Sequence, residues 1–413
     1  MSESHTQPTT NVVQDNSGDS ADADGGDTHP FTGEIAEYKS FDDMNLKLNL
    51  LRGIYAYGFE KPSPIQSRAI VPILSKRDVI GQAQSGTGKT GTFLISALQR
   101  VDETLKQPQA LILAPTRELA GQIFGVLQSL SSYLDVKSIL LIGGDTRRDD
   151  IRALEDTPRQ FIVGTPGRVY DMLKNRSLSS KELRMFILDE ADEMLSRGFE
   201  DQIYEIFQYV PQTCQTVLMS ATMPPEALKM TENFMDDPIK ILVQNEELTL
   251  EGIKQFYISI EKDAWKLETL VDIYSKLQVN QSIIYCNTKR TADWLVEQLN
   301  SRDYAVKCIH SNMKADERKA VMQEFRDGDL RVIIATDIIS RGIDVQQVSI
   351  VINYDIPPLK DVYIHRIGRS GRFGRKGVAI NFVTQDDVNK LKTIQTYYQT
   401  NIEEMPDSIE DLI

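Results

Sequence analysis

"AQSGTGKT", residues 83–90, follows the apolar run Val79-Ile80-Gly81 and ends in the Gly-Lys-Thr of a phosphate-binding loop. Alanine stands at position 83, where the usual G-x-x-x-x-G-K-[ST] pattern has its first glycine. Gly86 and Gly88 permit the positive φ that lets backbone N–H groups converge on a phosphate at a helix start. Ala83 lies at the strand exit, where any residue can be extended. We therefore predict a working phosphate loop rather than a glycine-rich turn with an incidental lysine.

This loop and a second motif together offer the groups that triphosphate hydrolysis needs. Lys89 can reach the outer phosphates, and the Thr90 hydroxyl can ligate Mg²⁺. Asp189 and Glu190 follow an apolar strand, so one carboxylate can hold Mg²⁺ and the other can orient the attacking water. The alternative is a charged helix start, because acids are favoured at helix N-termini. The phosphate loop makes the catalytic interpretation preferable.

The composition limits the possible classes of protein. A chain of 413 residues is too long for one typical core, so two domains are expected. Its 41% hydrophobic and 26% charged residues are typical of a soluble globular protein. No apolar run approaches the roughly 20 residues that span a bilayer, and no signal peptide is evident. Three scattered cysteines and four histidines form no familiar zinc pattern, so we expect no zinc site and a reducing, cytoplasmic location.

The formal charge of -14 is concentrated at the N-terminus. Residues 1–38 contain eight acids and no lysine or arginine, which leaves 52 acids and 46 bases in the remainder. This segment has too little apolar surface to fold, so we predict a disordered acidic tail that solvates without a partner.

From residue 39 onward, short apolar runs alternate with amphipathic stretches. The runs are "DVIGQA", "ALILAP", "SILLIGG", "QFIVGT", "MFILDEA" and "TVLMSAT", then "SIIYCNT", "RVIIATD", "SIVINYD" and "AINFVT". Helical spacing occurs between them, as at Leu119, Ile123, Leu127, Leu130 and Leu134. Continuous apolar strands are typical of parallel sheets covered on both faces. We predict an α/β fold with two such domains, 39–244 and 245–413, divided within the polar stretch "VQNEELTLEG".

Polar clusters follow these runs, where an open α/β sheet places its ligands. The last cluster, "HRIGRSGR" at residues 365–372, carries Arg366, Arg369 and Arg372 in the half without a phosphate loop. Arginine can stabilise the charge on a transferred phosphoryl group, although a solvated basic turn is the alternative. If these arginines act, the nucleotide lies between the halves and its hydrolysis opens or closes the cleft.

Taken in order, "AQSGTGKT", "PTRELA", "TPGR", "DEAD", "SAT", "ATD...RGIDV" and "HRIGRSGR" resemble the DEAD-box ATP-dependent RNA helicases over about residues 39–413. "DEADEMLSRGF" and "RGIDVQQVS" resemble the branch of that family that acts in translation initiation. The resemblance implies two tandem RecA-like domains, RNA-stimulated ATP hydrolysis with Mg²⁺, and unwinding of short duplexes in mRNA 5′ regions. It also implies a scaffold partner in the cap-binding complex and a monomer outside that complex.

The resemblance assigns roles to single residues. The catalytic residues would be Lys89, Asp189, Glu190, Arg369 and Arg372. Nucleotide binding would use Phe41, Gln66, Ser85, Gly86, Thr87, Gly88, Lys89, Thr90 and Asp344, with Thr90 and Asp189 at Mg²⁺. RNA would lie along Pro115, Thr116, Arg117, Gly144, Thr165, Gly167, Arg168, Asn287, Thr288, Gln323, Arg326, Thr336, Asp337 and Arg341. Coupling of the nucleotide site to domain closure would use Ser220, Thr222, Asp192, His365 and Arg366.

Some positions keep an alternative. "SPIQ" at residues 63–66 is also a capping box with proline at the first helical position, so Gln66 could cap a helix instead of reading adenine. "HSNM" at residues 310–313 departs from the H-G-D-M of the family, which affects any backbone contact that depends on glycine at Ser311. Neither departure removes a catalytic group.

The acidic charge is a counter-signal for RNA, because nucleic-acid-binding domains are usually basic. Arginines concentrated in the strand-end loops can still make a groove positive. We expect sequence-tolerant binding to the RNA backbone, with RNA preferred through its 2′-hydroxyls as the resemblance implies. Two other interpretations stay open: an ATP-locked RNA clamp of the exon junction type, and a phosphate-loop switch that binds no nucleic acid.

Overall fold

The computed structural model describes residues 36–84, 86–144, 146–196, 199–241, 253–276, 281–337, 348–370 and 377–406. The predicted acidic tail, apart from its last three residues, and the predicted domain boundary lie outside these ranges. Among the residues that the structure describes, no helix is long and apolar enough to cross a membrane.

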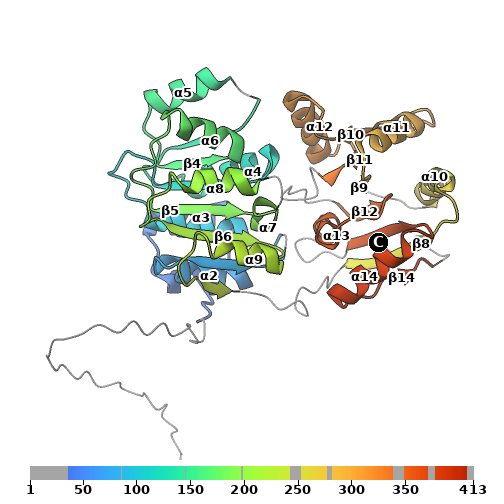
Figure 1. The fold of residues 1–413 in the computed structure, drawn as a ribbon, viewed down its shortest axis with the longest axis horizontal. Coiled ribbons are helices and arrows are strands. Elements are labelled where there is room, and N and C mark those ends of the chain that lie inside the picture. The colour runs from blue at the N-terminus through green and yellow to red at the C-terminus, as the bar shows by residue number, and fades with distance from the viewer. Residues whose placement is uncertain are drawn as a thin grey trace, which may run out of the picture. The chain divides into compact units, whose positions relative to one another are not determined.

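The first sheet has seven described strands, all parallel, in the order β3-β4-β2-β5-β6-β1-β7. Figure 1 labels β4, β5 and β6 of this sheet. The strands are β1 (Val79–Gln82), β2 (Ala110–Leu113), β3 (Ser138–Leu141), β4 (Phe161–Gly164), β5 (Met185–Asp189), β6 (Gln215–Ser220) and β7 (Ile239–Ile241). The helices are η1 (Phe41–Met44), α1 (Leu48–Tyr57), α2 (Pro64–Leu74), α3 (Lys89–Arg100), α4 (Arg117–Leu130), α5 (Arg147–Asp156), α6 (Pro166–Lys174), α7 (Ala191–Met194), α8 (Glu200–Phe207) and α9 (Pro225–Thr231).

The second sheet repeats this scheme with seven described parallel strands in the order β10-β11-β9-β12-β13-β8-β14. The strands are β8 (Ile253–Ser259), β9 (Ser282–Tyr285), β10 (Val306–Ile309), β11 (Val332–Ala335), β12 (Ile350–Asn353), β13 (Gly377–Val383) and β14 (Glu403–Glu404). The helices are η3 (Asp263–Trp265), α10 (Lys266–Lys276), α11 (Lys289–Asn300), α12 (Ala315–Asp327), α13 (Lys360–Ile367) and α14 (Val388–Tyr398).

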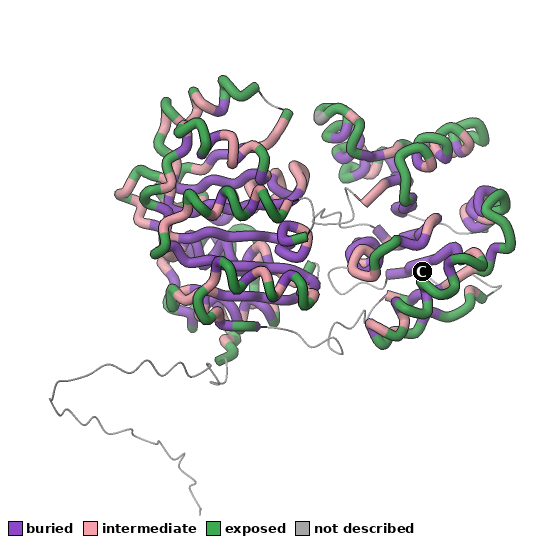
Figure 2. Tube along the Cα trace, in the orientation of Figure 1, coloured by how far each residue is buried: buried purple, intermediate pink, exposed green. Residues whose placement is uncertain are grey.

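Helices cover both faces of each sheet because successive strand residues alternate between the faces. On β2, Ala110 and Ile112 join the core beneath α1–α4, whereas Leu111 and Leu113 join the core beneath α6 and α8. In the second half, α12–α14 cover one face and α10 and α11 the other. Figure 2 shows the result, with buried strands and helices that are exposed along their outer sides. The predicted α/β fold with two RecA-like parallel sheets is confirmed.

The prediction missed the strands that are not continuously apolar. The edge strand β7 alternates between buried and exposed positions, β10 has an exposed and a half-buried residue between buried ends, Lys254 and Ser259 of β8 are exposed, and β14 has only two residues. These strands are polar on one side, so a search for apolar runs does not find them. The predicted helix through Leu134 is wrong in its last turn, because α4 ends at Leu130 and Ser131 is its C-cap. Leu134 still packs against the core beyond the helix.

Candidate functional site

The strand order brings three of the predicted clusters to one end of the first sheet. β5, β6 and β1 are neighbours, and Gln82 pairs with Ser220 while Asp189 pairs with Met219. The Ala83 N–H donates to the Ser220 carbonyl at 3.0 Å, so Ala83 continues the strand ladder as predicted. The loop after β1, the acids at the end of β5 and "SAT" at the end of β6 therefore adjoin one another.

The phosphate loop has the backbone geometry that its glycines predict. Gly86 has φ 82° and Gly88 has φ 102°, both in the left-handed region. A Cβ on Gly88 would also lie 2.8 Å from Gln66 Nε2 and from Ser63 Oγ. Both the positive φ and the lack of space therefore favour glycine at this position. α3 begins at Lys89, immediately after this turn. The N–H groups of its first turn are thus available to an anion.

Lys89 is buried and its ammonium group lies against its own loop. Its Nζ donates to the Ala83 carbonyl at 2.8 Å and to the Gln84 carbonyl at 3.2 Å. Burial lowers the pKa of Lys89, and the carboxylates of Glu190 and Asp189 oppose that shift. The charge of Arg369 also lowers the Lys89 pKa. An arginine of the second half therefore acts electrostatically on a residue of the phosphate loop.

Asp189 and Glu190 are both almost fully buried. Burial, with the neighbouring Glu190 charge, raises the pKa of Asp189 to about 7, and Lys89 opposes this shift. The Glu190 N–H donates to Asp189 Oδ1 at 3.0 Å, and Glu190 has φ 51°, which is uncommon for a glutamate. A divalent cation would favour the ionised carboxylate that burial disfavours. The pair therefore fits the Mg²⁺ that an NTP-hydrolysing site needs.

Asp192 connects this edge of the first sheet with the second half of the chain. Ser220 Oγ donates to Asp192 Oδ1 at 2.7 Å, and Thr222 Oγ1 donates to Oδ2 at 2.5 Å. His365 Nε2, from α13, lies 3.2 Å from the same Oδ2, and its Nδ1 lies 4.0 Å from Glu190 Oε2. All five side chains are buried. The Asp192 carboxylate thus contacts Ser220 and Thr222, which lie at and just after the end of the strand next to the phosphate loop, and also His365 of "HRIGRSGR".

The arginines of "HRIGRSGR" have different environments. Arg369 is 2% exposed, and its Nε donates to the His365 carbonyl at 3.1 Å. Its positive charge lowers the pKa of Lys89. Arg372 lies outside the described residues, as do Ser85, Asp344 and Arg341. Arg369 therefore has the position expected of an arginine finger, and its role stays a prediction.

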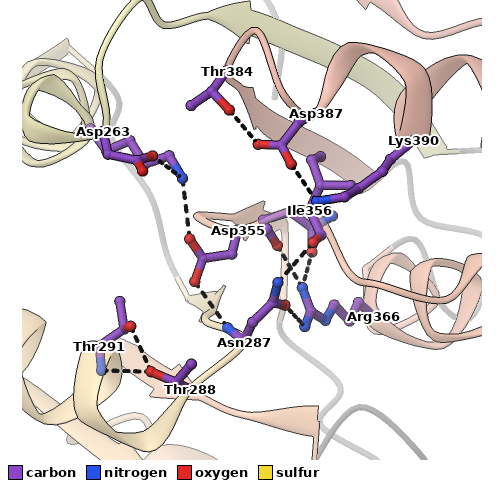
Figure 3. A network of polar contacts seen from close by, with 12 residues as sticks. Asp263, Asn287, Thr288, Thr291, Asp355, Ile356, Arg366, Thr384, Asp387 and Lys390 are labelled. Atoms are coloured by element: carbon purple, nitrogen blue, oxygen red, sulfur yellow. Dashed lines mark hydrogen bonds and ion pairs between the residues drawn. The ribbon is translucent and has the colours of Figure 1, made fainter.

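Arg366 is fully buried at the carboxyl end of the second sheet (Figure 3). Its guanidinium donates to Asp337 Oδ1 at 2.6 Å, Asn287 Oδ1 at 2.8 Å and the Asp355 carbonyl at 2.8 Å, with Asn353 Oδ1 at 3.3 Å. These partners follow or end β9, β11 and β12, which are neighbours in the sheet. They all belong to the second half, so Arg366 supports two predicted RNA residues there, and its coupling role stays a prediction.

Comparison with known proteins identifies the family. The family model described as "DEAD/DEAH box helicase" matches residues 63–231, and the one described as "Helicase conserved C-terminal domain" matches residues 265–374. The chain belongs to the DEAD/DEAH box helicase family. It is an ATP-hydrolysing helicase, as the motifs predict.

Similar proteins are found both among known sequences and among solved structures. The helicase is 60% identical over 374 residues to the ATP-dependent RNA helicase eIF4A of Chaetomium globosum, with 91% of this chain and 94% of that protein covered. The eIF4A of Schizosaccharomyces pombe is also 60% identical, with 91% and 95% covered. Among solved structures, S. cerevisiae Dbp5 bound to RNA and ADP BeF3 matches with a TM-score of 0.85 and 38% identity, covering 89% of this chain and 96% of that chain.

The RNA residues predicted in the first half of the helicase follow β2, β3 and β4, beside the nucleotide edge. Thr116 caps α4 by accepting from the Leu119 N–H at 3.2 Å, and Arg117 is the first residue of that helix. The other positions are Pro115, buried after β2; Gly144, exposed with φ 112°; and Thr165, Gly167 and Arg168 at the start of α6, where Arg168 pairs with Asp150. The predicted RNA residues follow the neighbouring strands β3, β4 and β2. The nucleotide candidates follow β5, β6 and β1, which come next in the sheet, so the two groups lie side by side along its edge.

The RNA residues predicted in the second half occupy two places. Asn287 and Thr288 follow β9, while Thr336 and Asp337 follow the neighbouring β11. Gln323 and Arg326 are exposed on α12, and Gln323 Nε2 donates to Asp327 Oδ1 at 2.9 Å. The four strand-end residues share one edge of the sheet, as they do in the first half.

The adenine candidates of the helicase have other contacts as well. Gln66 and Ser63 form the capping box that "SPIQ" predicts, and this contact does not exclude a role of Gln66 at the adenine. Gln66 Nε2 also lies 3.4 Å from the Gly88 carbonyl of the phosphate loop. Phe41 is fully buried, with its ring stacked toward Phe59 at a centroid distance of 6.4 Å. Stacking of adenine on Phe41 would require one ring face to be uncovered, and both adenine roles stay predictions.

A further contact between the halves was not predicted. Arg318 of α12 lies with its Nε 3.4 Å from Oε1 of Glu118, which belongs to "PTREL" at the start of α4. The Arg318 side chain is 6% exposed and that of Glu118 is 14% exposed, so water screens this pair little. Local sequence patterns do not indicate this contact, because it joins residues of two helices that are 200 positions apart in the chain. On the same helix, the family resemblance assigns RNA contacts to Gln323 and Arg326 and no role to Arg318.

We expect Glu118→Gln to lower RNA-stimulated ATP turnover about tenfold, or by about 1.4 kcal/mol, because the substitution removes the charge attraction of this largely buried ion pair between the halves. The measurement is steady-state ATP hydrolysis with saturating RNA. The reversed pair Glu118→Arg with Arg318→Glu should recover part of the loss. A double variant as impaired as the sum of its single changes would contradict the contact's role.

Proposed function

We propose that this helicase unwinds short duplexes in the 5′ regions of mRNA during translation initiation, using ATP and Mg²⁺. The observation that carries the proposal is the meeting of Lys89, the Asp189–Glu190 pair and Arg369 around one phosphate loop. Identity of about 60% to curated eIF4A proteins over 91% of the chain supports the same process. The phosphate-loop site supports ATP turnover, and the family relationship supports RNA binding and duplex unwinding.

The proposed roles extend the geometry to a reaction. Lys89 would bind the outer phosphates, and Thr90 and Asp189 would hold the Mg²⁺ that neutralises them. Glu190 would orient the attacking water, which its buried position next to Asp189 supports. Arg369 would stabilise the developing charge, together with Arg372. Phe41, Gln66 and Asp344 would contact the nucleoside.

The division of labour between the parts of the chain is also a proposal. Residues 39–244 would form the nucleotide-binding RecA-like domain and residues 245–413 the domain that supplies the arginines. RNA would lie across the strand-end residues of both sheets, and Asp192, which accepts from Ser220 and lies near His365, would report nucleotide state to the second domain. We further propose a cytoplasmic monomer that joins a scaffold of the cap-binding complex.

Steady-state ATP hydrolysis with and without single-stranded RNA tests the function. Strong stimulation by RNA, together with ATP-dependent separation of a short duplex, is the expected result. RNA retained with ATP and released slowly, without multiple turnover, would indicate a clamp of the exon junction type instead. Turnover that RNA does not change would indicate a phosphate-loop switch.

We expect deletion of residues 1–38 to change RNA-stimulated ATP turnover by no more than about twofold. The eight acids of this segment repel RNA only weakly, because charges are screened over a Debye length of roughly 8 Å at physiological salt. The same steady-state assay at two salt concentrations measures the effect. A large loss of activity would show that the tail contributes more than solvation.

A further inference from the structure

Outside the nucleotide site, a cluster in the second half brings together three different types of metal-ligand atom. Cys308 lies on β10, His310 directly follows that strand, and Asp293 lies on α11, which packs against β10. The Cys308 sulfur, a His310 ring nitrogen and an Asp293 carboxylate oxygen all lie within 4.8 Å of one another. These residues have no role in the proposed ATP or RNA chemistry.

The backbone explains why these side chains meet. Cys308 and His310 are two residues apart in an extended segment, so they point to the same face of the sheet. Asp293 approaches that face from the first turns of α11. His310 Nε2 lies 2.8 Å from Asp293 Oδ1, and Cys308 Sγ donates to the same oxygen at 3.4 Å. Ligand atoms around one tetrahedral Zn²⁺ lie about 3–4 Å apart, so the cluster needs only small movements to accept an ion.

The burial of the three side chains suits an ion reached from solvent. His310 is 7% exposed, and its Nε2 is the ring nitrogen that faces Asp293. Asp293 also lines a surface pocket of about 610 Å³, together with Lys289, Arg290 and Asn312. The Asp293 side chain is exposed, so an ion can reach the cluster from solvent.

We propose that Asp293, Cys308 and His310 bind a transition-metal ion of the zinc class. Thiolate and imidazole ligands select Zn²⁺ or Co²⁺, whereas Mg²⁺ prefers oxygen ligands. Water can supply a fourth ligand, because the Asp293 side chain is exposed to solvent. The thiol proton leaves to solvent when the sulfur binds the ion. The expectation of no zinc site assumed that no histidine lies at metal-ligand spacing with a cysteine, and the Cys-Ile-His run at residues 308–310 departs from that assumption.

The bound ion would join α11 to the edge strand β10. In the metal-free chain only hydrogen bonds to one carboxylate oxygen connect these three side chains. Thr288 is the N-cap of α11 and lines the same pocket, so the ion would fix the segment that precedes Asp293. The site is separate from the Asp189–Glu190 pair, and Mg²⁺ in an ATPase assay does not fill it.

Titration of the full-length protein with Co²⁺ tests the site, because a cobalt–thiolate bond has its own absorption band. We expect one equivalent of Co²⁺ to produce this band and Zn²⁺ to remove it by displacement. Cys308→Ser keeps a hydroxyl donor for Asp293 but loses the thiolate, so the band disappears. The affinity for Zn²⁺ should fall by more than the roughly 10- to 100-fold that loss of an outer partner costs.

Matched variants separate the site from other thiols. Cys214→Ser changes a buried cysteine of the first half and should leave the band intact. Asp293→Asn alters an exposed carboxylate, so the protein keeps its fold while Co²⁺ binding weakens. A band that survives Cys308→Ser, a band that Cys214→Ser removes, or the absence of any saturable band with excess Co²⁺ would each overturn the proposal. ATP turnover in Mg²⁺ alone should be the same for wild type and Cys308→Ser.

Discussion

Replacing Arg369 with alanine is expected to lower RNA-stimulated ATP turnover by up to about three to five orders of magnitude, the range known for loss of an arginine finger. Arg369 is buried, and its charge already lowers the pKa of Lys89 at the phosphate loop. A positive group in that position stabilises the charge that develops on the transferred phosphoryl group. Arg372 follows three residues later and can reduce the loss.

Single-turnover ATP hydrolysis with saturating RNA measures this effect, and nucleotide binding to the first half should be retained. Arg369→Lys is the matched variant, because it keeps a positive charge but loses the planar fork, and it should recover only part of the rate. Arg302→Ala, which removes a surface arginine paired with Glu268, is the control for the loss of any second-half arginine. Turnover by Arg369→Ala within about tenfold of wild type would show that Arg369 is not a principal stabiliser.

The motif residues were predictable because their chemistry is local. Gly88 illustrates this, since a loop entering a helix requires positive φ, and the structure has φ 102° there. Ala83 was equally predictable, because an extended residue that pairs with Ser220 needs no glycine. The continuous apolar runs likewise identified the central strands, since both faces of a parallel sheet are covered.

The strand order was not predictable from local patterns. Nothing in the residues of β1 indicates that it lies between β6 and β7, yet this order places "SAT" next to the phosphate loop. The Glu118–Arg318 contact depends in the same way on long-range packing, as does the burial of Arg366 beneath two predicted RNA residues. The spacing of apolar residues indicates which face of a helix or strand is buried, but it does not indicate which other element packs against that face.

Gln66 shows that one residue can satisfy two interpretations. Its carbonyl oxygen accepts from the Ser63 N–H at 2.9 Å, which completes the capping box, while its Nε2 approaches the Gly88 carbonyl. A helix cap fixes the side chain and thereby positions its amide next to the phosphate loop. The choice between cap and ligand that the sequence presents is therefore not exclusive in the structure.

Asp189→Asn and Glu190→Gln are both expected to reduce ATP turnover to near background, for different reasons. Asparagine at position 189 removes the carboxylate proposed to hold Mg²⁺, so nucleotide affinity in Mg²⁺ should fall with the rate. Glutamine at position 190 cannot accept a proton from the attacking water, so ATP and RNA should stay bound while turnover stops. Equilibrium nucleotide binding and single-turnover hydrolysis distinguish the two outcomes. Near-normal turnover by Glu190→Gln would remove Glu190 from the mechanism.

Asp189→Asn should also stabilise the nucleotide-free protein, and the pH dependence of that gain is specific. The folded state raises the Asp189 pKa from 3.8 to about 7, so between these values the folded chain binds more protons than the unfolded chain. The free energy of unfolding therefore falls as pH rises from about 4 to 7, and the lost stability is not regained above pH 7. Asparagine does not titrate, so the variant's advantage should be small near pH 4 and reach roughly 4 kcal/mol at pH 8, since one pKa unit corresponds to about 1.4 kcal/mol. Urea unfolding of both proteins at the two pH values, without Mg²⁺ or nucleotide, measures it. A variant less stable than wild type at pH 8 would mean that the Asp189 carboxylate is held by its contacts with Lys89 and the Glu190 N–H more strongly than burial opposes it.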